Sequence, residues 1–155
     1  MSAAARRLLD ASTLCAIATV GPDGSAYANT AYFAFGREFV VVWMSEPNAQ
    51  HSRNIRERGT AAIAVYDSSQ AWGRPDRGIQ LFGSAREATD SDEAETLYAD
   101  RFREFDRADF DAYRFYGFRP DRIKPFDEEE LGGGLFVTAR VEEGGRLVWE
   151  ETQVY

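Results

Sequence analysis

The chain has 155 residues, 44% of them hydrophobic, which is enough for one globular domain spanning residues 1–155. Its net charge of -8 argues against nucleic-acid binding, because that function needs a basic face. The first ten residues lack the apolar core of a signal peptide and no apolar run reaches the ~18 residues of a membrane span, so we expect a cytoplasmic protein.

The first half of the chain predicts two short helices and four strands. Pro22 and Gly24 mark the first turn, since proline fixes one φ angle and glycine tolerates a positive one. The only cysteine, Cys15, lies in an apolar segment, which favours a buried, inert thiol and leaves no disulfide or thiolate metal site. The predicted elements are the helices Ser2–Asp10 and Ala49–Arg58 and the strands Thr13–Val20, Ser25–Phe35, Phe39–Met44 and Thr60–Tyr66.

The second half predicts further strands around one helix. Ser91 with the acidic residues after it is a helix-start signal, and Ala94, Leu97 and Tyr98 follow at helical spacing. Gly83 indicates a bulge or a close backbone approach inside a strand. No alternating βαβ pattern appears, so the whole predicts a mainly β (α+β) fold, an antiparallel barrel with helical appendages. The predicted strands are Gly78–Glu87, Tyr113–Ile123 (broken by Pro120), Leu135–Val141 and Leu147–Trp149.

The junction between strand Phe39–Met44 and the next helix is the most informative segment. Asn48 is expected to cap this helix, whose N-terminal amides and partial positive charge suit a phosphate. The only histidine, His51, lies here with Ser52 and Arg53 in a basic island of an acidic chain. The alternative interpretation is an ordinary solvated surface helix. One histidine cannot supply most metal centres or catalytic triads, so we expect no metal site and name no catalytic residue.

Four blocks of sequence carry a resemblance to a known family. The chain resembles the pyridoxamine 5′-phosphate oxidase-like split-barrel flavoproteins. Two later blocks, Tyr98–Phe102 and Ile123–Gly134, look closer to a small uncharacterised bacterial branch of that superfamily. The resemblance implies an antiparallel six-stranded split β-barrel with flanking helices that binds FMN in a cleft of a homodimer. The blocks are Leu14–Thr19 with the turn at Pro22–Gly24, Ala28–Phe33, Val42–Ser45 with His51–Arg53, and Arg77–Gly83.

The same resemblance implies roles by position. The second strand would lie along the flavin ring, the third strand and following helix would hold the ribityl phosphate, and Gln80 would face the ring from the partner subunit or support it. Trp72 is expected to cover the flavin, to stack against a substrate, or to pack its loop onto the barrel. The implied cofactor-binding residues are Asn29, Thr30, Ala31, Trp43, Met44, Ser45, His51, Ser52, Arg53 and Gln80.

Several positions depart from the oxidases of that family. Ala28 stands where they have a basic residue, His51 where they have lysine, and Gly78 where they have glutamine. The C-terminal tryptophan and arginine motif that reads pyridoxine phosphate is absent. We therefore predict that the chain is not a pyridoxine phosphate oxidase, and that its phosphate affinity is weaker and pH-dependent.

The resemblance predicts a small dimeric FMN-dependent oxidoreductase that acts on a small-molecule substrate. The aromatic surplus of Phe33, Phe35, Trp43 and Trp72 predicts a two-fold homodimer interface, on the order of 2,000 Å² or more. The alternatives are a non-catalytic flavin- or small-molecule-binding protein, or use of F420 or haem in the same cleft. Binding of F420 would require a basic groove. Binding of haem would require an axial ligand, for which His51 is the only histidine.

Overall fold

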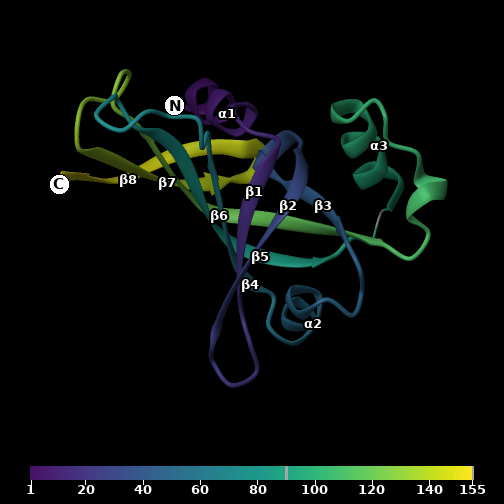
Figure 1. The fold of residues 1–155 in the computed structure, drawn as a ribbon. Coiled ribbons are helices and arrows are strands. Elements are labelled where there is room, and N and C mark those ends of the chain that lie inside the picture. Colours follow the sequence, from purple (N-terminus) through teal and green to yellow (C-terminus); the bar gives the residue numbers. More distant parts are fainter. Residues whose placement is uncertain (90, 155) are drawn as a thin grey trace.

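The computed structural model describes residues 1–89 and 91–154 (Figure 1). Within them eight strands form one antiparallel sheet in the order β3-β2-β1-β4-β5-β6-β7-β8, and β3 also pairs with β6. That last pairing closes the first six strands into a barrel, so the predicted six-stranded barrel with helices is confirmed. The strands are β1 (Leu14–Val20), β2 (Ala26–Phe35), β3 (Val41–Ser45), β4 (Thr60–Tyr66), β5 (Arg77–Glu87), β6 (Arg114–Asp127), β7 (Leu135–Glu142) and β8 (Arg146–Val154), and the helices are α1 (Ser2–Asp10), α2 (Gln50–Glu57) and α3 (Ser91–Arg101).

The barrel interior is filled by side chains that alternate along the strands. Ile17, Phe33 and Leu81 point inward and are fully buried, because every second residue of a strand faces the same side. Trp43 and Tyr116 are paired across β3 and β6, and their rings stack 5.9 Å apart. Two members of the predicted aromatic surplus, Phe33 and Trp43, therefore belong to the core and cannot support a dimer interface.

The β5–β6 ladder contains the bulge that Gly83 predicts. Its register shifts between Phe82 and Gly83, and a Cβ atom at Gly83 would lie 2.2 Å from the carbonyl oxygen of Arg119. The expected break of β6 at Pro120 is wrong, because the strand continues to Asp127. Pro120 stands opposite Gly83 at the bulge, where the ladder is already irregular and a missing N–H costs little.

The helices lie on three sides of the barrel (Figure 1). α1 packs against β4, β5 and β6 through Ala5, Leu8 and Leu9, and α2 lies toward the opposite end, against β1, β2 and β5. α3 covers the outer surface of β2, β3 and β6, where Ala94 and Tyr98 are buried. No helix among the described residues is long and apolar enough to cross a membrane.

Candidate functional site at the junction of β3 and α2

The end of β3 and the first turn of α2 bring Ser45 and His51 into direct contact. The Oγ atom of Ser45 lies 2.5 Å from Nε2 of His51, and Ser45 is buried while His51 is half-buried. Burial lowers the pKa of His51 below its ordinary value of 6.5, because desolvation disfavours the charged imidazolium. At neutral pH the pair is therefore a neutral imidazole hydrogen-bonded to a hydroxyl.

The N-terminus of α2 has free donors rather than the predicted cap. The helix follows Ala49, no side chain caps it, and the proposed Asn48 cap is therefore wrong. The first backbone N–H with an acceptor is that of Arg53, which donates to Ala49. The amides of Gln50, His51 and Ser52 have no backbone or side-chain acceptor within residues 1–89 and 91–154. Three N–H groups at the positive end of a helix dipole form an anion-binding arrangement.

Two arginines hold the turn that precedes α2. Arg53 donates to the carbonyl oxygen of Asn48 and, at 2.5 Å, to Oε1 of Gln50. Arg56 donates to the carbonyl oxygen of Pro47 at 2.7 Å. Both arginines are exposed, so their charges lie at the surface beside the free amides of the helix. This arrangement supplies the basic island that the sequence indicates.

The helix itself is anchored to the barrel by buried polar contacts. Asn54 is buried and donates from Nδ2 to Oγ1 of Thr19 on β1, at 3.0 Å. Its Oδ1 atom accepts from Nε2 of Gln50 at 2.8 Å, and Ile55 adds a buried apolar contact. Sequence reasoning missed Gln50 and Asn54, although polar residues four apart on one helix face are a readable signal. These contacts fix the direction in which the N-terminus of α2 points.

Three of the implied cofactor-binding residues face the barrel interior, and a fourth, Ser52, is buried on α2. Asn29 and Ala31 lie opposite Ile17 and Cys15 on the inner side of the sheet, while Trp43 and Ser52 are fully buried. The side chains of Trp43 and Ser52 therefore cannot touch a ligand outside the barrel. The Oδ1 of Asn29, Nε1 of Trp43 and Oγ of Ser52 are buried without a partner among the described residues.

Thr30, Met44 and Gln80 lie on the outer side of the sheet, apart from that inner group. The register runs from Thr30 across Ala16 and Ala64 to Gln80. Three strand spacings separate Thr30 from Gln80, about 14 Å. Gln80 and Thr30 are therefore too far apart to contact the same atom of a ligand. The predicted set thus divides into an inner group, an outer group and the Ser45–His51 junction.

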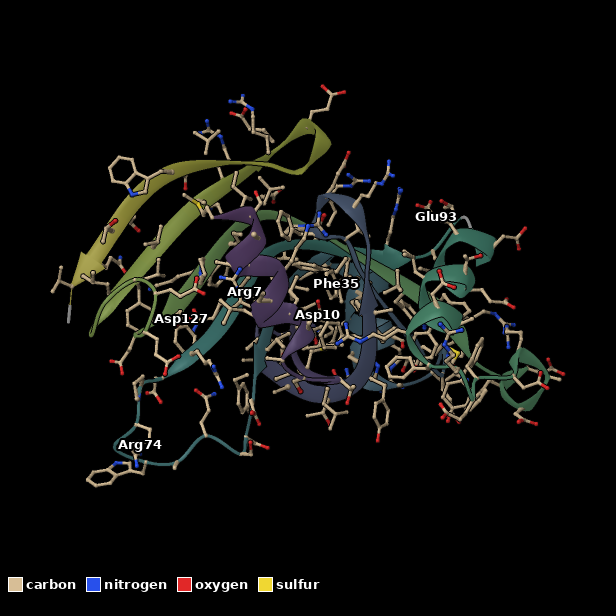
Figure 2. The ribbon with its side chains drawn as sticks, turned by 90° about the horizontal axis from the view of Figure 1, so that it is seen from above. Arg7, Asp10, Phe35, Arg74, Glu93 and Asp127 are labelled. Atoms are coloured by element: carbon tan, nitrogen blue, oxygen red, sulfur yellow. The ribbon has the colours of Figure 1, made fainter. Side chains whose placement is uncertain are left out.

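Two other predictions about single residues have clear outcomes. Cys15 is buried, and burial raises the pKa of its thiol to about 12, which makes the thiolate inaccessible at neutral pH. Packing of Trp72 onto the barrel is wrong, since its side chain is 102% exposed. Figure 2 shows Arg74 on the same loop, which projects away from the sheet.

Comparison with known proteins agrees with this architecture. The family model described as pyridoxamine 5′-phosphate oxidase matches residues 1–126. The chain belongs to the pyridoxamine 5′-phosphate oxidase family. That membership confirms the resemblance carried by the four sequence blocks, all of which lie within the matched residues. A search of curated protein sequences finds no match.

Solved structures share the split-barrel fold of the family. A putative pyridoxamine 5′-phosphate oxidase from Listeria innocua has a TM-score of 0.65 at 13% identity, covering 83% of this chain and 95% of its own. A haem-binding protein from Mycobacterium smegmatis has a TM-score of 0.64 at 17% identity, covering 97% of this chain and 56% of its own. An F420 reductase has a TM-score of 0.58 at 25% identity, covering 76% of this chain and 94% of its own. The chain thus spans little more than half the length of the mycobacterial protein.

Proposed function

We propose that this protein is a small homodimeric oxidoreductase that binds FMN, with the phosphate at the N-terminus of α2. The three acceptor-free amides of Gln50, His51 and Ser52 carry the proposal, because they offer a site for a phosphate where a side-chain cap would have closed it. The exposed guanidinium of Arg53 adds charge beside them. Membership of the oxidase family supports a flavin as the group that the phosphate belongs to.

The residues around α2 fit such a cofactor. Arg53 and the backbone amides would hold the phosphate, and Ser45 with His51 would hold the turn next to it. Thr30, exposed on the outer surface of β2, would lie along the rest of the molecule, whereas Met44 on β3 packs partly buried against the apolar cluster under α3. Bound FMN supplies hydride and electron transfer, while the protein positions it, excludes water and tunes it by hydrogen bonds. The substrate is a small molecule. Similarity of fold does not identify it, because specificity depends on the residues of the site.

A homodimer would complete this site. The outer sheet surface of β1, β2 and β4 carries a floor of small side chains, which we call the alanine face. Leu14, Tyr32, Tyr66 and Phe82 stand around it with 40% to 56% of each side chain exposed. Exposed apolar area of this kind favours a self-complementary interface. Through it, Gln80 of one protomer would approach the cofactor of the other. The alanine face consists of Ala16, Ala18, Ala28, Ala62 and Ala64.

Haem and F420 are the alternative cofactors, since one solved neighbour binds haem and another is an F420 reductase. His51 is the only histidine, and its Nε2 is hydrogen-bonded to Ser45, so axial ligation through that atom requires loss of this bond. A non-catalytic flavin- or small-molecule-binding protein is the remaining alternative. The departures at Ala28 and His51 from the oxidase pattern motivate it.

The absorption spectrum of freshly purified protein, followed by reconstitution with each cofactor, tests the proposal. We expect flavin bands that bleach when a nicotinamide cofactor is added. A Soret band would identify haem, and not FMN, as the bound cofactor. The absorption band of F420 would identify the deazaflavin instead. Flavin binding without oxidation of the added nicotinamide cofactor would show a non-catalytic flavin-binding protein. Failure to bind FMN would overturn the proposal.

A further inference from the structure

A groove lies between α3 and the barrel, away from the β3–α2 junction. Its volume is about 800 Å³, within the ~300–1,000 Å³ range of small-molecule sites. The walls come from the β2–β3 turn, β3, the ends of β5 and β6, and α3, which stands beside β3 in Figure 1. None of the implied cofactor-binding residues lines it. The groove is therefore separate from the implied cofactor site.

A glycine opens the floor of this groove. Gly117 on β6 lies in register between Val42 on β3 and Arg86 on β5, and a Cβ atom built there would meet nothing within 4 Å. Any side chain at this position would enter the groove. Val42 and Leu97 supply apolar surface on the two sides, from the sheet and from α3. The lining beside Gly117 is thus an apolar slot, while polar and charged side chains line the rest of the groove.

The rim of the groove is basic in an acidic protein. Three arginines line it against two glutamates, whereas the whole chain carries a net charge of -8. Arg119 is paired with Glu38 at 2.8 Å. The guanidinium groups of Arg37 and Arg86 have no hydrogen bond or ion pair within the part of the chain that the structure describes. Two unpaired guanidiniums beside an apolar slot match a molecule with an anionic head.

The turn that forms one wall is held in an unusual backbone conformation. Glu38 and Phe39 have φ angles of 56° and 60°, a region that costs non-glycine residues energy. The ion pair of Glu38 with Arg119 and the full burial of Phe39 hold this conformation in place. The groove wall is thus a fixed feature of the fold, and Glu93 of α3 lies at its other side (Figure 2).

We propose that this groove binds a small amphipathic anion: an apolar body lies over Gly117 and a carboxylate, phosphate or sulfonate head is held by Arg86 and Arg37. The inference goes beyond the flavin site and does not depend on it. Bidentate contact with a guanidinium favours carboxylate and phosphate heads, and the apolar slot selects a chain or a ring system over an inorganic ion.

The test measures binding of the fluorescent aromatic anion 1-anilinonaphthalene-8-sulfonate to the full chain, with decanoate and decyltrimethylammonium as competitors. Gly117→Leu fills the slot, and Gly133→Leu is its control, since that glycine lies outside the groove and a Cβ atom there would meet only Oε1 of Glu128, at 4.0 Å. Arg86→Gln removes one guanidinium that would hold the anionic head, at an exposed position where the change should not affect folding. The role of charge can therefore be tested even if Gly117→Leu fails to fold. FMN binding by each variant is measured in parallel.

We expect saturable binding that Gly117→Leu and Arg86→Gln weaken at least tenfold, while Gly133→Leu has no effect. Decanoate should displace the probe and the cation with the same tail should not. FMN affinity should stay unchanged in all variants, which separates this site from the proposed function. Wild-type probe affinity in folded Gly117→Leu, or equal displacement by the cation, would overturn the proposal.

Discussion

His51 illustrates how a single residue differs between the free and the bound protein. In the free chain burial lowers its pKa, so at neutral pH it adds no positive charge to the helix N-terminus. A bound phosphate dianion would favour the imidazolium and raise the pKa, while the helix dipole and desolvation oppose that change. The contribution of His51 to phosphate binding is therefore expected to be modest and largest at the acidic side of the bound-state pKa.

The lowered pKa of His51 predicts a specific loss of stability in mild acid. Because the unfolded chain binds this proton more readily than the folded one, the stabilisation is present above pH ~6.5 and is lost as the pH falls through the folded value. The melting temperature of the wild type should fall further between pH 7 and pH 5 than that of His51→Gln. Parallel melting curves for the two proteins across this range would contradict the assignment.

Arg53 is the residue whose removal should affect cofactor binding most directly. Its guanidinium is exposed beside the free amides of α2, so Arg53→Ala is expected to weaken FMN binding by roughly 1.5 to 3 kcal/mol, the range of a charged hydrogen bond. Fluorescence quenching of FMN measures the change. Arg103→Ala, an exposed arginine just after α3, is the matched control, and an equal loss there would show a general charge effect and no site.

At the scale of elements, α2 is placed by buried contacts rather than by a cap. The Asn54 side chain joins the helix to Thr19 on β1, inside the barrel end. Asn54→Ala should lower the free energy of unfolding by about 1 to 3 kcal/mol, since Thr19 loses its partner in a buried place. Asn48→Ala should change it by no more than about 0.5 kcal/mol, because Asn48 is exposed and does not cap the helix. Urea unfolding measures both free energies, and a larger loss for Asn48→Ala than for Asn54→Ala would contradict this anchoring of α2.

The elements also show what the sequence can and cannot predict. The bulge at Gly83 was readable because a glycine inside an apolar strand pattern has few other uses. The continuation of β6 past Pro120 was not, because the tolerance for proline depends on a bulge in a strand far away in sequence. The sequence also does not show which residues of β2 face the barrel interior, since Asn29, Thr30 and Ala31 do not alternate clearly in hydrophobicity. The β3–α2 junction and the free amides of its helix were predicted from the sequence, whereas the uncapped start at Ala49 was not, because Asn48 is a good capping residue by type alone.

At the scale of the molecule, the alanine face predicts a homodimer. Ala62 lies near its middle, in register with Ala18 and Phe82, so a charge there would be buried without a partner on association. Analytical ultracentrifugation should give twice the 17.4 kDa chain mass for the wild type and the chain mass for Ala62→Glu. Ala99→Glu, an exposed position on α3, should remain dimeric. A wild-type monomer at micromolar concentration would contradict this account.

The comparison of FMN with riboflavin tests the central claim, which is that the N-terminus of α2 binds the phosphate of a flavin. The two ligands differ only in the phosphate, so the ratio of their dissociation constants isolates the contribution of the amides and Arg53. We predict that cofactor-free protein binds FMN at least about 10-fold more tightly than riboflavin, as one or more charged hydrogen bonds require. Equal affinity for the two ligands, or no saturable binding of either, would show that the N-terminus of α2 does not bind a flavin phosphate.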